Sequence, residues 1–121
     1  MSRESTAHYT WGDGCDGWHL LRSAALSVIH ERMPPRTAEV RHRHRLARQL
    51  FFVLDGELSV EVEGVHHTVG PRCGLEVMPG AAHEVRNDGP VAAEFLVVSA
   101  PPSHGDRELA PSGVPSGEDG A

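Results

Sequence analysis

Short runs of strand-forming residues, separated by turn residues, fill the middle of the chain. The segment ELSVEVE (57–63) alternates polar and apolar residues with period two, LSVIHERM (26–33) alternates in part, and QLFFVL (49–54) is aromatic and β-branched. Such runs are typical of β-strands. Apolar residues do not recur convincingly at the i, i+3, i+4, i+7 spacing of an amphipathic helix. The pattern therefore predicts a protein built mainly from β-strands.

Glycine and proline separate these runs. Asp55-Gly56 is a typical two-residue hairpin turn and predicts a hairpin between 49–54 and 57–63. Further strands are expected at 66–69, 74–78, 83–87 and 92–99. Many short strands at regular turn spacing predict an all-β barrel or sandwich.

The two ends of the chain differ in composition from its middle. Residues 101–121 are dominated by Pro, Gly, Ser and charged residues, so we expect a tail that is disordered at least after about Leu109. Residues 1–16 are polar and glycine-rich and are interpreted as an N-terminal arm. This leaves residues 17–100 for one domain, and a chain of 121 residues can bury one modest core.

The charge balance excludes some partners. The formal net charge is −6, and all 11 basic residues are arginine. We expect no nucleic-acid partner, because such binding requires a basic face. The sequence has no apolar run of membrane-span length and no signal-peptide pattern, so we expect no membrane partner and a cytoplasmic location. The absence of lysine suggests a GC-rich bacterial source. Cys15 and Cys73 match no metal or redox spacing and are expected to be unpaired thiols.

The segment RHRHRLARQ (41–49) has the chemistry of either a basic patch or a metal site. In an extended strand, residues two apart share a face, so His42 and His44 point together. The opposite face then carries Arg41, Arg43 and Arg45. Strand parity therefore separates the histidines, which we expect to face inward, from the arginines outside.

Two imidazoles are only half of a metal site, because a divalent ion usually takes three or four side-chain ligands. Gln49 opens the next predicted strand, and His83 begins another strand after the tight turn at Pro79-Gly80. Three neutral imidazoles and an amide oxygen would leave coordination positions open for water or substrate. That is the arrangement of a catalytic site, not of a closed structural one.

Two segments resemble the conserved motifs of the cupins. His42-x-His44, four residues, Gln49, six residues and Gly56 resembles the first motif, HxH-x(3,4)-E-x(6)-G, with Gln in place of the usual Glu. The segment GLEVMPGAAHEVRN (74–87) resembles the second, G-x(5)-PxG-x(2)-H-x(3)-N, with Met78 where the first proline normally stands. The resemblance covers about residues 40–87 and extends through the strand pattern to about residue 100. It implies a small single-domain cupin, an antiparallel β-barrel of jelly-roll type.

The resemblance also implies a divalent metal ion held by His42, His44, Gln49 and His83. These ligands suit Zn, Fe, Mn, Ni and Cu alike. A neutral glutamine leaves the full charge of the ion in place, which makes it a stronger Lewis acid. Similar three-histidine sites occur in small cupins of the pectin-degradation type, in certain aromatic polyketide cyclases and in some dioxygenases. Gln49 is alternatively an outer hydrogen-bond donor to a metal-bound water.

The fold hosts many chemistries, so three functions remain open. The first is a metal-dependent enzyme of isomerase, cyclase or lyase type that acts on a small oxygen-bearing organic molecule by Lewis-acid chemistry. The second is a metal-dependent oxygenase or dioxygenase. The third is a non-catalytic module that binds a metabolite. Many small cupins pair, so the resemblance also implies a homodimer.

The candidate catalytic residues are His104, Glu31 and Arg32. His104 lies in the segment SHGDR (103–107), which is either tail or a lid over the barrel mouth. Of Glu31 and Arg32, strand alternation turns one toward the interior. We expect the barrel to be lined by Phe51, Val53, Val77 and Val85.

Overall fold

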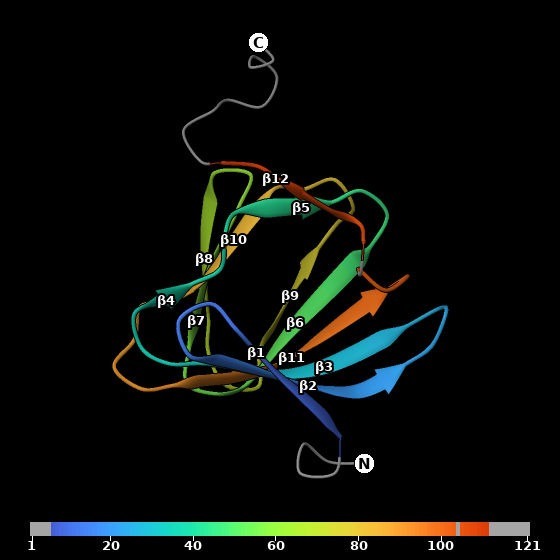
Figure 1. Ribbon diagram of the computed structural model, residues 1–121. Coiled ribbons are helices and arrows are strands. Elements are labelled where there is room, and N and C mark those ends of the chain that lie inside the picture. The colour runs from blue at the N-terminus through green and yellow to red at the C-terminus, as the bar shows by residue number, and fades with distance from the viewer. Residues whose placement is uncertain (1–5, 104, 112–121) are drawn as a thin grey trace.

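The computed structural model describes residues 6–103 and 105–111. Within these residues the chain forms strands, turns and loops and no helix (Figure 1). The strands are β1 (Ala7–Trp11), β2 (Cys15–Arg22), β3 (Ser27–Met33), β4 (Thr37–Ala38), β5 (His42–His44), β6 (Arg48–Asp55), β7 (Leu58–Val62), β8 (Val65–Val69), β9 (Gly74–Val77), β10 (His83–Asn87), β11 (Ala93–Ala100) and β12 (Arg107–Leu109).

The strands form two antiparallel sheets that face each other (Figure 1). The first sheet has the order β1-β2-β3-β11-β6-β9. The second has the order β12-β5-β10-β7-β8, and β4 adds to β10. Neighbours in each sheet are mostly distant in sequence, as in a jelly roll. This confirms the predicted all-β, jelly-roll type of barrel.

The core lies between the sheets and follows from the alternation of the strands. Along β11, every second side chain is buried, and its neighbour β6 repeats the pattern. The predicted lining residues are confirmed as part of this core, with buried side chains at Phe51, Val53, Val77 and Val85. Both cysteines are free, as expected, Cys15 within the core and Cys73 exposed.

The hairpin predicted at Asp55-Gly56 is wrong. β6 pairs with β11 and β9 in the first sheet, whereas β7 pairs with β8 and β10 in the second. Gly56 has a φ of 76°, and a Cβ there would lie 2.5 Å from the carbonyl oxygen of Ala92. The glycine therefore lets the chain pass close to the β10–β11 connection as it crosses between the sheets. The local turn signal could not distinguish this crossing from a hairpin.

The segments at both ends add edge strands to the sheets. β1 pairs with β2 at the edge of the first sheet, in the region interpreted as an arm. β12 pairs with β5 at the edge of the second sheet and runs beside it in Figure 1. The expected disorder beyond residue 111 falls outside the described residues. None of the described residues belongs to a helix long and apolar enough to cross a membrane.

Candidate metal centre

His42 and His44 lie on β5 with one residue between them, and both face the interior of the barrel. Their side chains are 2% and 7% exposed, while the arginine between them, Arg43, is half-buried on the opposite face. Arg41 lies on that same outer face and pairs with Glu61 through two hydrogen bonds of 2.6 and 2.9 Å. The burial pattern confirms the separation of histidines and arginines by strand parity.

His83 comes from the neighbouring strand. In the antiparallel pair of β10 and β5 it stands directly opposite His42, and it is fully buried. The turn before it is anchored to the same strand, because the Gly80 amide donates a 2.7 Å hydrogen bond to the His44 carbonyl oxygen. Gly80 has a φ of 83°, a conformation that glycine adopts without strain. The Pro79-Gly80 turn thus sets the position of His83 against β5.

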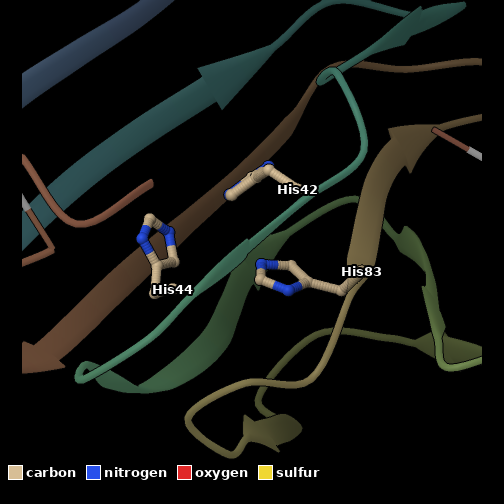
Figure 2. A group of neighbouring side chains, drawn as sticks. All are labelled: His42, His44 and His83. Carbon is tan, nitrogen blue, oxygen red and sulfur yellow. The ribbon is translucent and has the colours of Figure 1, made fainter. Parts of the chain in front are cut away.

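The three imidazoles converge on one point (Figure 2). One ring nitrogen from each of His42, His44 and His83 lies within 4.8 Å of the other two. The ring centroid of His42 lies 4.8 Å from that of His44 and 4.6 Å from that of His83. Nitrogen atoms held at the usual ligand distance of about 2.0–2.1 Å from one ion lie at most about 4.2 Å apart, so small side-chain shifts would bring the cluster onto a single ion.

Backbone carbonyls fix the orientation of two of these rings. The Nδ1 atom of His42 lies 2.7 Å from the Val40 oxygen, and that of His83 lies 3.0 Å from the Ala81 oxygen. A carbonyl only accepts, so both Nδ1 atoms carry the proton and both Nε2 atoms keep a free lone pair. The Nε2 of His83 is buried without a hydrogen-bond partner, as is the Nδ1 of His44. Metal-binding histidines commonly have such a carbonyl behind them.

Gln49 is buried in the same cavity. Its side-chain nitrogen donates a 3.0 Å hydrogen bond to the Ser99 hydroxyl, across the paired strands β6 and β11. In this orientation the amide oxygen lies on the side of the amide group away from the hydroxyl. The oxygen is buried and has no hydrogen-bond partner. A buried unpaired carbonyl oxygen is costly unless something binds it.

Burial keeps the imidazoles neutral. It lowers the pKa of His42 to about 3, with further lowering from the neighbouring His83 and His44. Burial also lowers the pKa values of His44 and His83. Neutral imidazole is the form that binds a metal ion, so no proton has to leave at neutral pH. The donor set of three ring nitrogens and one amide oxygen therefore fits a divalent transition-metal ion.

The site opens into a cavity of about 260 Å³. His42, His44 and Gln49 lie in its wall. The rest of the wall combines apolar and ionisable side chains, namely Tyr9, Ile29, Glu31, Glu39, Phe51, Val97, Ser103, Gly105 and Arg107. A small organic molecule entering this space would meet both the histidines and a group of acids.

Among the carboxyl groups in the cavity wall, Glu31 has a hydrogen-bond partner on another strand. Its carboxylate accepts a 3.0 Å hydrogen bond from the Tyr9 hydroxyl. Burial raises the pKa of Glu31 to about 8, and the nearby Glu39 carboxylate adds to the effect. Burial likewise raises the pKa of Glu39 to about 7, which the Arg107 guanidinium opposes. The cavity therefore contains carboxyl groups that can hold or release a proton near neutral pH.

Of the three candidate catalytic residues, the structure brings Glu31 to the cavity. Arg32 is the next residue on β3 and faces the other side of the sheet, where it lies 3.7 Å from Asp16. His104 lies outside the described residues. Its neighbours Ser103 and Gly105 both line the cavity.

The segment after residue 103 is tied to the loop between the histidines and Gln49. The Asp106 carboxylate accepts hydrogen bonds from the amides of Arg45, Leu46 and Ala47, at 2.9 to 3.1 Å. These amides hold the pKa of Asp106 below its usual range. Asp106 therefore anchors the C-terminal segment beside the cavity.

Sequence reasoning missed Tyr9 and Glu39. In the sheet, Tyr9 stands opposite Gly17, which stands opposite Glu31. A Cβ on Gly17 would lie 2.2 Å from the tyrosine ring, so the absent side chain lets that ring reach across β2. The signal was a glycine inside a strand, which often marks a close approach, but its partner depends on register.

Comparison with solved structures supports the fold. A cupin from Shewanella frigidimarina described as RmlC-like has a TM-score of 0.77 at 20% identity, covering 84% of this chain and 89% of that chain. KdgF from Halomonas sp. has a TM-score of 0.76 at 15% identity, covering 84% and 91%. A sugar phosphate isomerase from a cupin superfamily of Silicibacter pomeroyi has a TM-score of 0.73 at 21% identity, covering 83% and 74%.

Sequence comparison identifies the family. No curated protein matches the chain. The profile of the cupin domain family matches residues 29–99, which is more than half of the chain and contains every residue of the histidine cluster. The two facing antiparallel sheets agree with this match. The chain therefore belongs to the cupin family.

Proposed function

We propose that this protein is a divalent-metal-dependent enzyme that acts on a small oxygen-bearing organic molecule as an isomerase, cyclase or lyase. The proposal includes His42, His44, His83 and Gln49 as the metal ligands. The observation that carries it is a group of buried polar atoms without hydrogen-bond partners, namely His44 Nδ1 and His83 Nε2 in the histidine cluster and the side-chain oxygen of Gln49, which lines the same cavity as His42 and His44. Unpaired buried polar atoms are rare in folded proteins, and several in one place call for a ligand.

A bound divalent ion would supply Lewis-acid polarisation of carbonyl or hydroxyl oxygens. The four protein ligands are all neutral, so they would leave the charge of the ion undiminished. The wall of the cavity supplies the proton chemistry. Glu31 is placed there to give or take a proton at a carbon next to the polarised oxygen, and Tyr9 orients its carboxyl group.

The comparisons are compatible with this reaction class. One of the similar structures is a sugar phosphate isomerase, and an aldose–ketose isomerisation through an enediol moves a proton between the carbonyl carbon and the carbon next to it. The fold alone does not select this reaction. The acid group beside the histidines is the feature of this chain that favours proton transfer over oxygen chemistry.

The test combines metal replacement with isotope exchange. Chelator-treated protein is reloaded separately with Zn, Mn, Fe, Ni or Cu and incubated in D₂O with a panel of aldoses, ketoses, uronates and β-keto acids. Proton NMR follows deuterium entering next to the carbonyl, and an oxygen electrode follows oxygen consumption. We expect metal-dependent exchange or isomerisation without oxygen uptake, lost in Glu31→Gln and retained in a matched surface variant, Glu57→Gln.

Two outcomes would contradict the proposal. Oxygen consumed in proportion to product would instead support the oxygenase. Tight binding of a panel member without exchange, turnover or oxygen uptake would support a non-catalytic metabolite-binding module.

We also infer a homodimer. The outer face of the first sheet carries an apolar row across four strands, because Leu50 pairs with Val98, Val98 with Val28, and Val28 with Leu21. Leu50 is 40% exposed and Leu21 is 36% exposed. A second copy packed on this face would remove the row from water, which favours association.

A further inference from the structure

A second cavity, of about 550 Å³, lies beside the metal cavity. The two share Tyr9, Ile29 and Ser103 in their walls, so they meet at these residues. The other lining residues of the second cavity are His19, Arg22, Ser23, Ser27 and Pro102. Its position suggests that a molecule bound at the histidines would extend into this space.

Strand register places the two ends of this combined space. Gln49 stands opposite Ser99, Ser99 opposite Ser27, and Ser27 opposite Arg22. These four residues form a row across the inner face of the first sheet. Gln49 and Arg22 are three strand spacings apart, on the order of 14 Å between their backbones. One end of the row is the proposed metal ligand, and the other end is a guanidinium.

A β-bulge at Leu20 puts Arg22 on this face. Before the bulge, His19 pairs with Ile29; after it, Leu21 pairs with Val28 and Arg22 with Ser27. Strict alternation from His19 would have turned Leu21 inward and Arg22 outward. The extra residue reverses this parity, and bulges near active sites commonly re-aim a side chain in this way.

The charge of Arg22 is available to a ligand. Its guanidinium lies 3.5 Å from the Nε2 atom of His19. No carboxylate of the described residues lies within ion-pair distance of it, whereas Arg41, Arg48 and Arg86 all have one. An arginine that faces a cavity without an acidic partner suits an anionic group, above all a carboxylate, which matches its planar donors.

The wall between the two ends combines an apolar part with hydroxyl groups, among them those of Ser27 and Ser103. Ile29 lies in the wall of both cavities, and the Tyr9 ring packs against the His19 ring with centroids 4.9 Å apart. Pro102 adds a further apolar surface. The apolar part of this wall can cover a flat or aliphatic body, while the serine hydroxyls can bind oxygen atoms along it.

We propose that the substrate is an elongated organic acid, with metal-binding oxygens at one end and a carboxylate held by Arg22 at the other. The inference rests on the proposed metal-dependent function. It adds a substrate class and a specificity-determining residue: Arg22 selects among molecules that have the same metal-binding head.

The test uses three metal-binding probes on zinc-loaded protein, with affinities measured by calorimetry. Acetohydroxamate, benzohydroxamate and 4-carboxybenzohydroxamate share one chelating head and differ in body and far end. We expect the carboxylated probe to bind about tenfold more tightly than benzohydroxamate, as for a charge-assisted hydrogen bond. Arg22→Gln should abolish this preference and leave acetohydroxamate binding unchanged. Arg72→Gln, which removes an exposed arginine from the turn before β9, is the matched control and should keep the preference.

The outcomes separate the two proposals. Equal affinity of the wild type for the two aromatic probes, or a preference that survives in Arg22→Gln, would overturn the carboxylate site and leave the metal centre standing. Failure of the zinc-loaded wild type to bind acetohydroxamate would contradict the metal centre, and this inference with it.

Discussion

At the scale of single residues, Gln49 differs from the other three proposed ligands because its donor atom would be an amide oxygen. Its nitrogen is occupied by the Ser99 hydroxyl, so its oxygen is the atom left for an ion. A glutamate at this position would bring a negative charge to the same place. Substitutions at Gln49 can therefore change the charge of the metal complex while keeping a donor oxygen, or remove the donor oxygen without adding charge.

We predict that Gln49→Glu retains the metal ion but slows metal-dependent proton exchange, because the carboxylate partly neutralises the ion. Gln49→Leu, which has no donor oxygen, should weaken metal affinity by about 10- to 100-fold. Metal titration and the isotope-exchange assay measure the two effects. Full exchange activity in Gln49→Glu would show that the neutral ligand has no role in the rate.

Glu31 gives a prediction for stability against pH. Its pKa rises from an ordinary value of 4.5 to about 8 on folding. Between these values the folded protein holds a proton that the unfolded chain has lost, so the contribution of Glu31 to stability falls as pH rises through this window. Glu31→Gln removes this loss and can still accept the Tyr9 hydrogen bond. The variant should be more stable than wild type at pH 8, by about 1–2 kcal/mol after allowance for solvent screening.

Thermal unfolding at pH 5 and pH 8 tests this sign. The gain in stability of Glu31→Gln over the wild type should be small at pH 5 and larger at pH 8. Glu57→Gln, at an exposed position before β7, should show no such trend. A variant with the same advantage at both pH values would mean that the carboxyl does not titrate in this window.

The sequence predicted the histidines better than the acids around them. His42, His44 and His83 follow from strand parity and from motif spacing, which are local properties. Tyr9 and Glu39 reach the cavity only through strand register, because Tyr9 extends across β2 to β3, and because β4, just before Glu39, pairs with β10. Single-sequence patterns contain little information about such register.

At the scale of elements, the N-terminal strands depend on one glycine. Tyr9 on β1 crosses β2 at Gly17 to reach Glu31 on β3. We predict that Gly17→Ala displaces the tyrosine ring, because the new Cβ would overlap it. The loss in unfolding free energy should be about 1–3 kcal/mol, in the range of an overpacked site.

Chemical denaturation measures the unfolding free energy, and near-ultraviolet circular dichroism reports the displacement of the Tyr9 ring. Gly70→Ala is the matched control, because a Cβ at Gly70 would meet nothing within 4 Å and Gly70, like Gly17, has no positive φ. It should leave the unfolding free energy nearly unchanged. An unaltered tyrosine signal in Gly17→Ala would contradict the crossing of Tyr9 over β2.

Strand prediction succeeded where burial alternates and failed where the chain changes sheets. The run at 57–63 contains β7, but its predicted partner was the strand just before it. In a jelly roll the partner is set by packing of the two sheets on one core, and a glycine turn between strands fits either connection. The bulge in β2 was invisible for the same reason, since it is defined by its partner strand.

At the scale of the whole molecule, we predict a homodimer that packs through the apolar row of Leu50, Val98, Val28 and Leu21. Light scattering after gel filtration should give about twice the chain mass of 13.1 kDa. Leu50→Glu should shift the protein to monomer. Val65→Glu, at a 57% exposed position on the edge of the other sheet, is the control. A wild-type protein of monomer mass would contradict the prediction.

Metal content tests the central claim most directly. Protein expressed with supplied Zn, Fe, Mn, Ni and Cu is analysed by mass spectrometry for bound metal, as wild type, His42→Ala and His66→Ala. His66 is exposed on β8 and controls for loss of a histidine. We predict about one ion per chain in the wild type and in His66→Ala, and almost none in a folded His42→Ala. Unchanged metal content in His42→Ala would contradict the account.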